Sequence, residues 1–124
     1  MIHLDANFLI GSVNQHSPPA VLLRNWLQHG ETFAASAIAW AEFLHGPVRS
    51  DQIQQADYLI QGNIVSFGRQ EAEISSRLFN QTGRRRGSQP DCFIAATAIR
   101  ARVPLATRNT RDFQLFVPLG LRLA

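Results

Sequence analysis

Lysine is absent from this sequence, and all 12 of its basic residues are arginine. Arginine binds phosphate through a planar fork and stacks on bases, so the bias favours a nucleic-acid partner. A GC-rich genome would produce the same bias, because arginine codons are rich in G and C. The formal net charge of +3 does not separate these two interpretations.

Cysteine and long apolar runs are also scarce. A single cysteine, Cys92, excludes an intrachain disulfide, and within an apolar stretch it is more typical of a packed side chain than of a nucleophile. No apolar run reaches the length of a membrane span, and residues 1–5 lack the basic start and apolar core of a signal peptide. We therefore expect a cytoplasmic protein that does not associate with a membrane.

The remaining composition is that of an ordinary globular chain, with 45% hydrophobic and 17% charged residues among 124. Without a repeat or a linker, this length predicts one domain over residues 1–124. The apolar patterns predict strands at 1–5, 32–35, 64–67, 103–107 and near 120–123, and helices at 8–10, 17–29, 37–45, 51–61, 70–82 and 89–98. This alternation predicts a three-layer α/β/α fold with a mostly parallel sheet of four to five strands.

One carboxylate stands at the start of the most apolar helix, in the stretch Gln89-Pro90-Asp91-Cys92-Phe93-Ile94-Ala95-Ala96-Thr97-Ala98. Pro90 suits the first turn of a helix, and the positive end of the helix dipole favours Asp91 there. The simpler interpretation is that Asp91 only caps and charges the helix end. A carboxylate that leads a buried helix must otherwise be paired, hydrogen-bonded or bound to a metal.

Other acids are predicted at the carboxyl edge of the sheet, where α/β folds bind ligands. Asp5 ends the first strand, and Asp112 lies in the loop after the fourth. The spacing does not place Asp91 beside Asp5, because its helix leads into the fourth strand and would begin at the opposite edge. Glu42, in a mostly apolar helix, is equally unplaced.

A cluster of these carboxylates would need a cation to offset its repulsion. Oxygen ligands without cysteine or paired histidines suit Mg²⁺ or Mn²⁺ better than zinc. The basic loop Arg84, Arg85 and Arg86 would then contact phosphates beside the acids. The alternative is a solvated helix end, where positive charge is favourable in any case.

Four stretches follow one another over nearly the whole length of the chain: Ile2-His3-Leu4-Asp5-Ala6-Asn7-Phe8-Leu9-Ile10, Ser36-Ala37-Ile38-Ala39-Trp40-Ala41-Glu42-Phe43-Leu44-His45-Gly46, Asp91-Cys92-Phe93-Ile94-Ala95-Ala96-Thr97-Ala98 and Leu105-Ala106-Thr107-Arg108-Asn109-Thr110-Arg111-Asp112-Phe113. Together, and in this order, they resemble the motifs of the PIN-domain ribonucleases, specifically the VapC toxins of bacterial toxin–antitoxin pairs.

The resemblance implies a shared pocket that holds Mg²⁺ or Mn²⁺. Asp5 and Asp91 would be the principal metal ligands, and Glu42 and Asp112 would complete the site and orient the nucleophilic water. In many relatives an aspartate stands at the position of Asn109, so this chain offers only a neutral amide there. That difference leaves the number of metal ions open.

The resemblance also implies supporting groups and partners. Ser36 and Thr107 look like the small hydroxyls that family members place near the pocket. Family members usually form homodimers and are silenced by an antitoxin, through which they reach operator DNA. Trp26, Trp40 and Phe43 are candidates for an antitoxin or dimer surface, although each is more typical of a core residue.

The leading hypothesis is therefore a metal-dependent endoribonuclease toxin of a type II toxin–antitoxin system. The alternative is a binding module, a toxin-like subunit of a DNA-bound regulatory complex with little or no nuclease activity. A phospho-acceptor domain that uses Asp5 or Asp91 is a remote third, disfavoured because such sites generally use a lysine. RNA cleavage by the purified protein separates the first two.

Overall fold

A four-stranded parallel sheet forms the centre of the computed structural model, which describes residues 1–124. The strands are β1 (Ile2–Leu4), β2 (Phe33–Ser36), β3 (Ile64–Val65) and β4 (Leu105–Ala106). Their order across the sheet is β3-β2-β1-β4, and every neighbouring pair is parallel. The predicted α/β fold with a mostly parallel sheet is confirmed. The sheet has four strands, the lower of the predicted four to five.

The strand expected near residues 120–123 is reduced to a single bridge between Leu105 and Leu123. Two hydrogen bonds hold it, from the amide of Leu105 to the carbonyl of Arg122 and from the amide of Ala124 to the carbonyl of Leu105, both 2.9 Å. The chain turns at Gly120, whose φ of +114° favours glycine.

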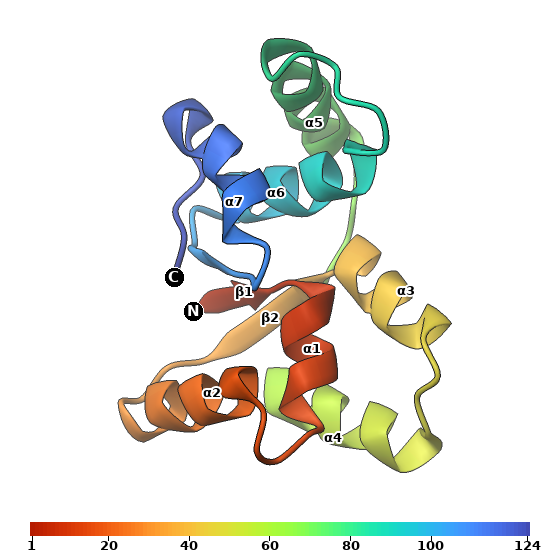
Figure 1. Cartoon of the computed structure of the whole chain (residues 1–124), viewed down its shortest axis with the longest axis vertical. Coiled ribbons are helices and arrows are strands. Elements are labelled where there is room, and N and C mark those ends of the chain that lie inside the picture. The colour runs from red at the N-terminus through yellow and green to blue at the C-terminus, as the bar shows by residue number, and fades with distance from the viewer.

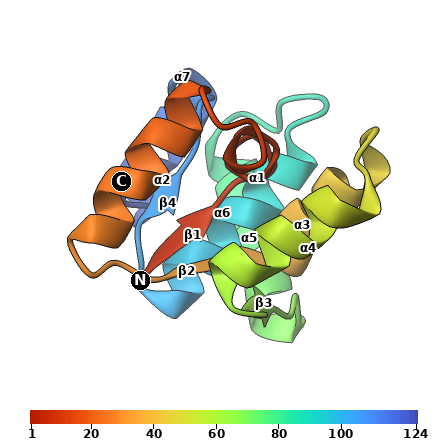
Figure 2. The same ribbon diagram turned by 90° about the horizontal axis from the view of Figure 1, so that it is seen from below.

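Helices cover both faces of the sheet (Figures 1 and 2). The helical segments are α1 (Ala6–Ser12), α2 (Pro18–Gln28), α3 (Ala37–His45), α4 (Ser50–Ile60), α5 (Arg69–Gln81), α6 (Gln89–Ala101), α7 (Thr110–Phe113) and the 3₁₀ segment η1 (Gln114–Leu119). Helices α1, α2 and α4 lie on one face, and α5, α6 and α7 lie on the other. Helix α3 leaves the carboxyl end of β2 and contacts both α1 and α6. None of the helices combines the length and apolar character needed to cross a bilayer.

The core contains the largest buried side chains from both halves of the sequence. Phe33, Phe43, Phe113 and Phe116 are each at most 1% exposed. Phe43 is therefore a core residue, and it supplies no antitoxin or dimer surface. Trp26 is half-buried and packs near the rings of Phe8 and Phe33.

Gly11 was expected to end the first helix, but it lies inside α1. The reason for a glycine here is a close approach between helices. A Cβ at position 11 would lie 2.6 Å from both Cβ and Cγ of Pro19, in the first turn of α2. A glycine at this point of the sequence predicts the end of the helix, whereas in the structure it allows α2 to pack closely on α1.

Replacing Gly11 with alanine should therefore destabilise the protein by about 1–3 kcal/mol, because the added methyl overpacks a rigid contact with a proline ring. Gly46→Ala is the matched control, since its Cβ would meet only the carbonyl oxygen of Phe43 at 3.5 Å. Urea unfolding of both variants measures the difference. Equal stabilities would show that the contact of Gly11 with Pro19 carries no constraint.

His3 is a second buried feature of the sheet, 3% exposed on the central strand, and its Nδ1 has no hydrogen-bond partner. Burial lowers the pKa of His3 from 6.5 to about 4, with a smaller contribution from the N-terminal amino group. The folded protein therefore holds the imidazole neutral where the unfolded chain binds a proton.

Between pH 6.5 and pH 4 the unfolded chain carries the additional proton, so the contribution of His3 to stability is lost as the pH falls through this window. Relative to His3→Leu, the wild-type protein should lose up to about 3 kcal/mol over that interval. Unfolding of both proteins at pH 7.5, 5.5 and 4.5 measures the difference. Parallel pH profiles would contradict a neutral buried imidazole.

Candidate active site

Asp5 is the most buried acid at the carboxyl end of the sheet, with 4% of its surface exposed. It ends β1 and caps α1, and its Oδ1 accepts a hydrogen bond of 2.7 Å from the amide of Ala6. Its Oδ2 accepts another of 2.7 Å from the hydroxyl of Thr107, at the end of β4. Burial raises the pKa of Asp5, and these two hydrogen bonds partly oppose the rise. The carboxylate is therefore fixed in orientation before any ligand arrives.

A chain of hydrogen bonds continues from Asp5 to Asp112. The hydroxyl of Thr107, which donates to Asp5, accepts from the amide of Asn109 at 3.0 Å. The side-chain Nδ2 of Asn109 then donates to Oδ2 of Asp112, also at 3.0 Å. Asn109 thus turns an amide N–H toward the neighbouring acid and holds it in place.

Asn7 belongs to the same network, although the sequence analysis did not identify it. Its Nδ2 donates to Oδ2 of Asp5 at 3.3 Å and to the hydroxyl of Thr107 at 3.4 Å. Its Oδ1 accepts from the amide of Arg108 at 3.1 Å. The available signal was a short amide in the first turn of α1, between the buried residues Ala6 and Phe8.

Asp91 lies at the same edge of the sheet as Asp5, because α6 begins there. The sequence predicted that this helix begins at the opposite edge. The chain leaves β3 through α5, and α6 then runs back to the amino end of β4 (Figure 1). A helix that returns to the start of a parallel strand must begin at the carboxyl edge. The opposite edge would follow only if α6 ran in the direction of β4, whereas a helix and the parallel strand that it leads into run in opposite directions.

Ser36 orients the helix that carries Glu42. Its hydroxyl is buried and accepts a hydrogen bond of 3.0 Å from the amide of Ala39, so it caps α3. No contact of Ser36 with a carboxylate is present. Glu42 is an exposed residue on this helix, and the pKa of its carboxyl is raised by desolvation and by repulsion from Asp5 and Asp91, opposed by His45.

The four predicted acids influence one another electrostatically. Desolvation raises the pKa of Asp91 to about 6, with further contributions from the negative charges of Asp5 and Asp112 and an opposing one from Arg85. Glu42 responds to Asp5 and Asp91 in the same way. The fold therefore brings together four acids from distant parts of the sequence, around Asp5 and Asp91.

This group of acids fits a hard divalent cation by its chemistry, since its side chains present oxygen atoms and repel one another. Burial, and after it repulsion from neighbouring acids, raises the pKa values of Asp91 and Glu42, and a bound cation would relieve the repulsion. No three aspartate, glutamate, histidine or cysteine side chains lie close enough together to enclose an ion as they stand. Binding of a metal ion would therefore require these side chains to draw closer together.

The three arginines of the basic loop differ in their surroundings. Arg84 lies over the ring of Phe79, with its guanidinium carbon 5.0 Å from the ring centre, and donates to Oδ1 of Asn80. Arg86 is exposed. Arg85 is the one that faces the acids, with Nη1 3.8 Å from Oδ1 of Asp112.

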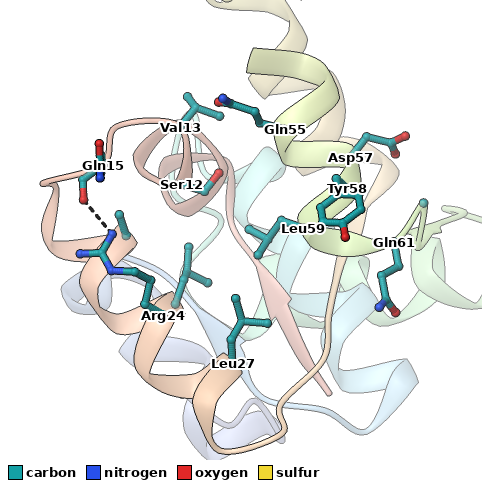
Figure 3. Close-up of a pocket in the computed structure, with 13 residues that line it drawn as sticks. Ser12, Val13, Gln15, Arg24, Leu27, Gln55, Asp57, Tyr58, Leu59 and Gln61 are labelled. Carbon is teal, nitrogen blue, oxygen red and sulfur yellow. Dashed lines mark hydrogen bonds between the residues drawn. The ribbon is translucent and has the colours of Figure 1, made fainter. Parts of the chain in front are cut away.

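A separate groove of about 1130 Å³ lies between α2 and α4 (Figure 3). Leu23, Leu27 and Leu59 contribute apolar side chains to it, and Arg24 lies at its margin with a hydrogen bond of 2.8 Å to the carbonyl of Gln15. None of the four acids lines this groove. The molecule therefore carries two distinct candidate surfaces, one acidic and one that combines apolar and polar side chains.

Comparison with solved structures finds the same fold in several bacterial complexes. A toxin–antitoxin complex from Klebsiella pneumoniae is 30% identical, with a TM-score of 0.72 over 91% of this chain and 90% of the other. VapBC2 from Rickettsia felis, bound to a DNA fragment from its promoter, is 25% identical, with a TM-score of 0.74 over 100% and 98%. FitAcB from Neisseria gonorrhoeae is 25% identical, with a TM-score of 0.72 over 99% and 96%.

No curated protein sequence matches the chain significantly. The sequence does match the PIN domain family, over residues 2–116. That range includes the four acids, the hydrogen-bond network between Asp5 and Asp112 and all four strands of the sheet. The chain belongs to the PIN domain family.

Proposed function

We propose that this protein is the toxin of a type II toxin–antitoxin pair and cleaves RNA as a metal-dependent endoribonuclease. The observation that carries the proposal is the gathering of Asp5, Glu42, Asp91 and Asp112 at one edge of the sheet, where desolvation by burial, and after it repulsion from Asp5 and Asp112, raises the pKa of Asp91 to about 6. PIN domains are generally nucleases that use divalent metal ions, and several similar structures are toxin–antitoxin complexes.

Asp5 and Asp91 would hold Mg²⁺ or Mn²⁺, directly or through water. A cation bound there would activate a water molecule and stabilise the attacking and leaving oxygens of an in-line displacement at phosphorus. Asp5 is suited to this role because Thr107 and the amide of Ala6 already fix its orientation.

The other two acids would orient the water and accept its proton. Glu42 is exposed and its carboxyl has a raised pKa, so a carboxylate oxygen of Glu42 is suited to act as the general base. Asp112 is held by Asn109, which keeps it directed toward the same region. Thr107 joins these two halves of the site, since it contacts Asp5 and the amide of Asn109.

Replacing Asp91 with asparagine should reduce RNA cleavage by about a hundredfold or more and abolish growth arrest, because a metal ligand is lost. Its melting temperature should not fall, because the neutral amide removes a charge that burial and neighbouring acids already disfavour. Cleavage by purified protein in Mg²⁺ or Mn²⁺ and thermal unfolding in EDTA measure the two effects.

Asp57→Asn is the control, since Asp57 is an exposed acid of α4 outside the cluster and its loss should leave cleavage unchanged. Full toxicity and full cleavage by the Asp91 variant would contradict the mechanism. If the wild-type protein cleaves no RNA in either metal but joins a DNA-bound complex with its antitoxin, the regulatory alternative holds. The DNA-bound complex from Rickettsia felis is the observation that favours keeping that alternative.

We also propose that the groove between α2 and α4 receives an apolar segment of the antitoxin. Leu27 exposes 47% of its surface at this groove, and one similar structure, from Klebsiella pneumoniae, is a toxin–antitoxin complex. This protein would then reach DNA only through the antitoxin, which would bind both of them. Formation of a homodimer stays a prediction.

A charged residue in the groove should release the antitoxin and spare the nuclease. Leu27→Asp is expected to weaken antitoxin binding by about tenfold or more, because a central apolar contact is replaced by a desolvated charge. Leu22→Asp is the matched control, on the same helix and similarly exposed (44% against 47%) but outside the groove. Binding is measured with purified antitoxin, and cleavage is measured without it. Equal binding by the two variants would place the antitoxin elsewhere.

A further inference from the structure

Arg85 is the arginine of the basic loop that lies beside the acidic cluster. Its position there does not follow from the composition of the loop, which has three consecutive arginines. The loop joins α5 to α6 and turns at Gly83 and Gly87, whose φ values of +86° and +81° favour glycine. Between them, the carbonyl of Arg85 accepts hydrogen bonds from the amide and the hydroxyl of Ser88, at 3.1 and 2.7 Å. These bonds fix the backbone of Arg85 at the start of the helix that carries Asp91.

The guanidinium of Arg85 is directed at the acids but forms no hydrogen bond with them. Its Nη1 lies 3.8 Å from Oδ1 of Asp112, which is too far for a hydrogen bond. Its Nε and Nη2 are buried and have no acceptor. The positive charge nevertheless acts on Asp91, where it opposes the rise in pKa caused by burial and by the other acids.

An arginine in this state is unusual, because buried polar groups almost always have a hydrogen-bond partner. Arg84 shows the ordinary outcome in the same loop, with its guanidinium over Phe79 and in contact with Asn80. Arg85 remains about one-third exposed (36% of its side chain), and Nη1, unlike Nε and Nη2, is not a buried atom. Nη1 has no hydrogen-bond partner within the chain, so an acceptor from outside can reach the guanidinium there.

An RNA phosphate is the acceptor that fits, on the premise that the protein is the proposed nuclease. A phosphodiester that approaches Asp5, Asp91 and Asp112 meets negative charge on each, and Arg85 is the arginine that contacts this cluster. A guanidinium at this position can donate to a non-bridging phosphate oxygen while the carboxylates remain free. The same positive charge must also disfavour a divalent cation held by the same acids.

We propose that Arg85 binds a phosphate of the RNA substrate at the edge of the acidic cluster and, through the same charge, weakens the binding of the divalent cation. The two effects have opposite signs. A residue that merely stabilised the loop would change RNA binding and metal binding in the same direction.

The test is Arg85→Gln, compared with wild-type protein and with Arg86→Gln as the matched control from the same loop. Mn²⁺ binding is measured by calorimetry without RNA. RNA binding is measured by fluorescence anisotropy with a labelled single-stranded oligonucleotide of mixed sequence in EDTA, where no cleavage takes place. We expect Arg85→Gln to bind Mn²⁺ roughly three- to tenfold more tightly and the RNA roughly three- to tenfold more weakly.

Arg85→Lys keeps the charge and guards against a folding defect. It should bind Mn²⁺ as the wild-type protein does, but should recover only part of the RNA affinity because a flexible ammonium does not reproduce the fixed direction of Nη1. Thermal unfolding of each variant in EDTA verifies that the fold is retained.

If Arg85→Gln weakens both ligands, or behaves as Arg86→Gln does, the inference about Arg85 is wrong even where the wild-type protein cleaves RNA. If the wild-type protein binds no Mn²⁺ and cleaves no RNA in its presence, the proposed nuclease function fails, and the role of Arg85 fails with it.

Discussion

A hydrogen bond between Thr107 and Asp5 determines how the rest of this site is arranged. It is 2.7 Å long, buried, and joins residues 102 positions apart at the ends of the two neighbouring strands β4 and β1. From Thr107 the network reaches Asn109 and then Asp112, and the side-chain amide of Asn7 donates to both Asp5 and Thr107. Because these partners satisfy Asp5 on one side, its carboxylate can stay charged in a buried position while facing other acids.

The parts of this site that follow directly from strands were predictable from the sequence. Asp5 and Thr107 each follow a short apolar run, and parallel strands place their carboxyl ends at one edge. The edge at which Asp91 lies follows from the same rule once α6 is recognised as the helix that leads into β4, since such a helix runs opposite to its parallel strand and begins at the carboxyl edge. Glu42 depends on the direction in which α3 leaves β2, which Ser36 sets through a cap that sequence alone does not orient.

The sequence indicated which polar residues lie near the site better than it indicated what each of them contacts. Ser36 and Asn109 were singled out as polar groups near a pocket, and the structure shows what each contacts: the amide of Ala39 and the carboxylate of Asp112. Gly11 was interpreted as a helix stop because a local pattern cannot register an approach of α2 to α1. Three consecutive arginines looked equivalent, but only Arg85 is directed at the acids.

The central claim is that Asp5 and Asp91 share a divalent cation, and crystals soaked in MnCl₂ test it most directly. An anomalous difference map should show a single strong peak between these two carboxylates, with both side chains drawn toward it. Absence of that peak, at a Mn²⁺ concentration that supports RNA cleavage in solution, or a peak remote from Asp5 and Asp91, would contradict the account.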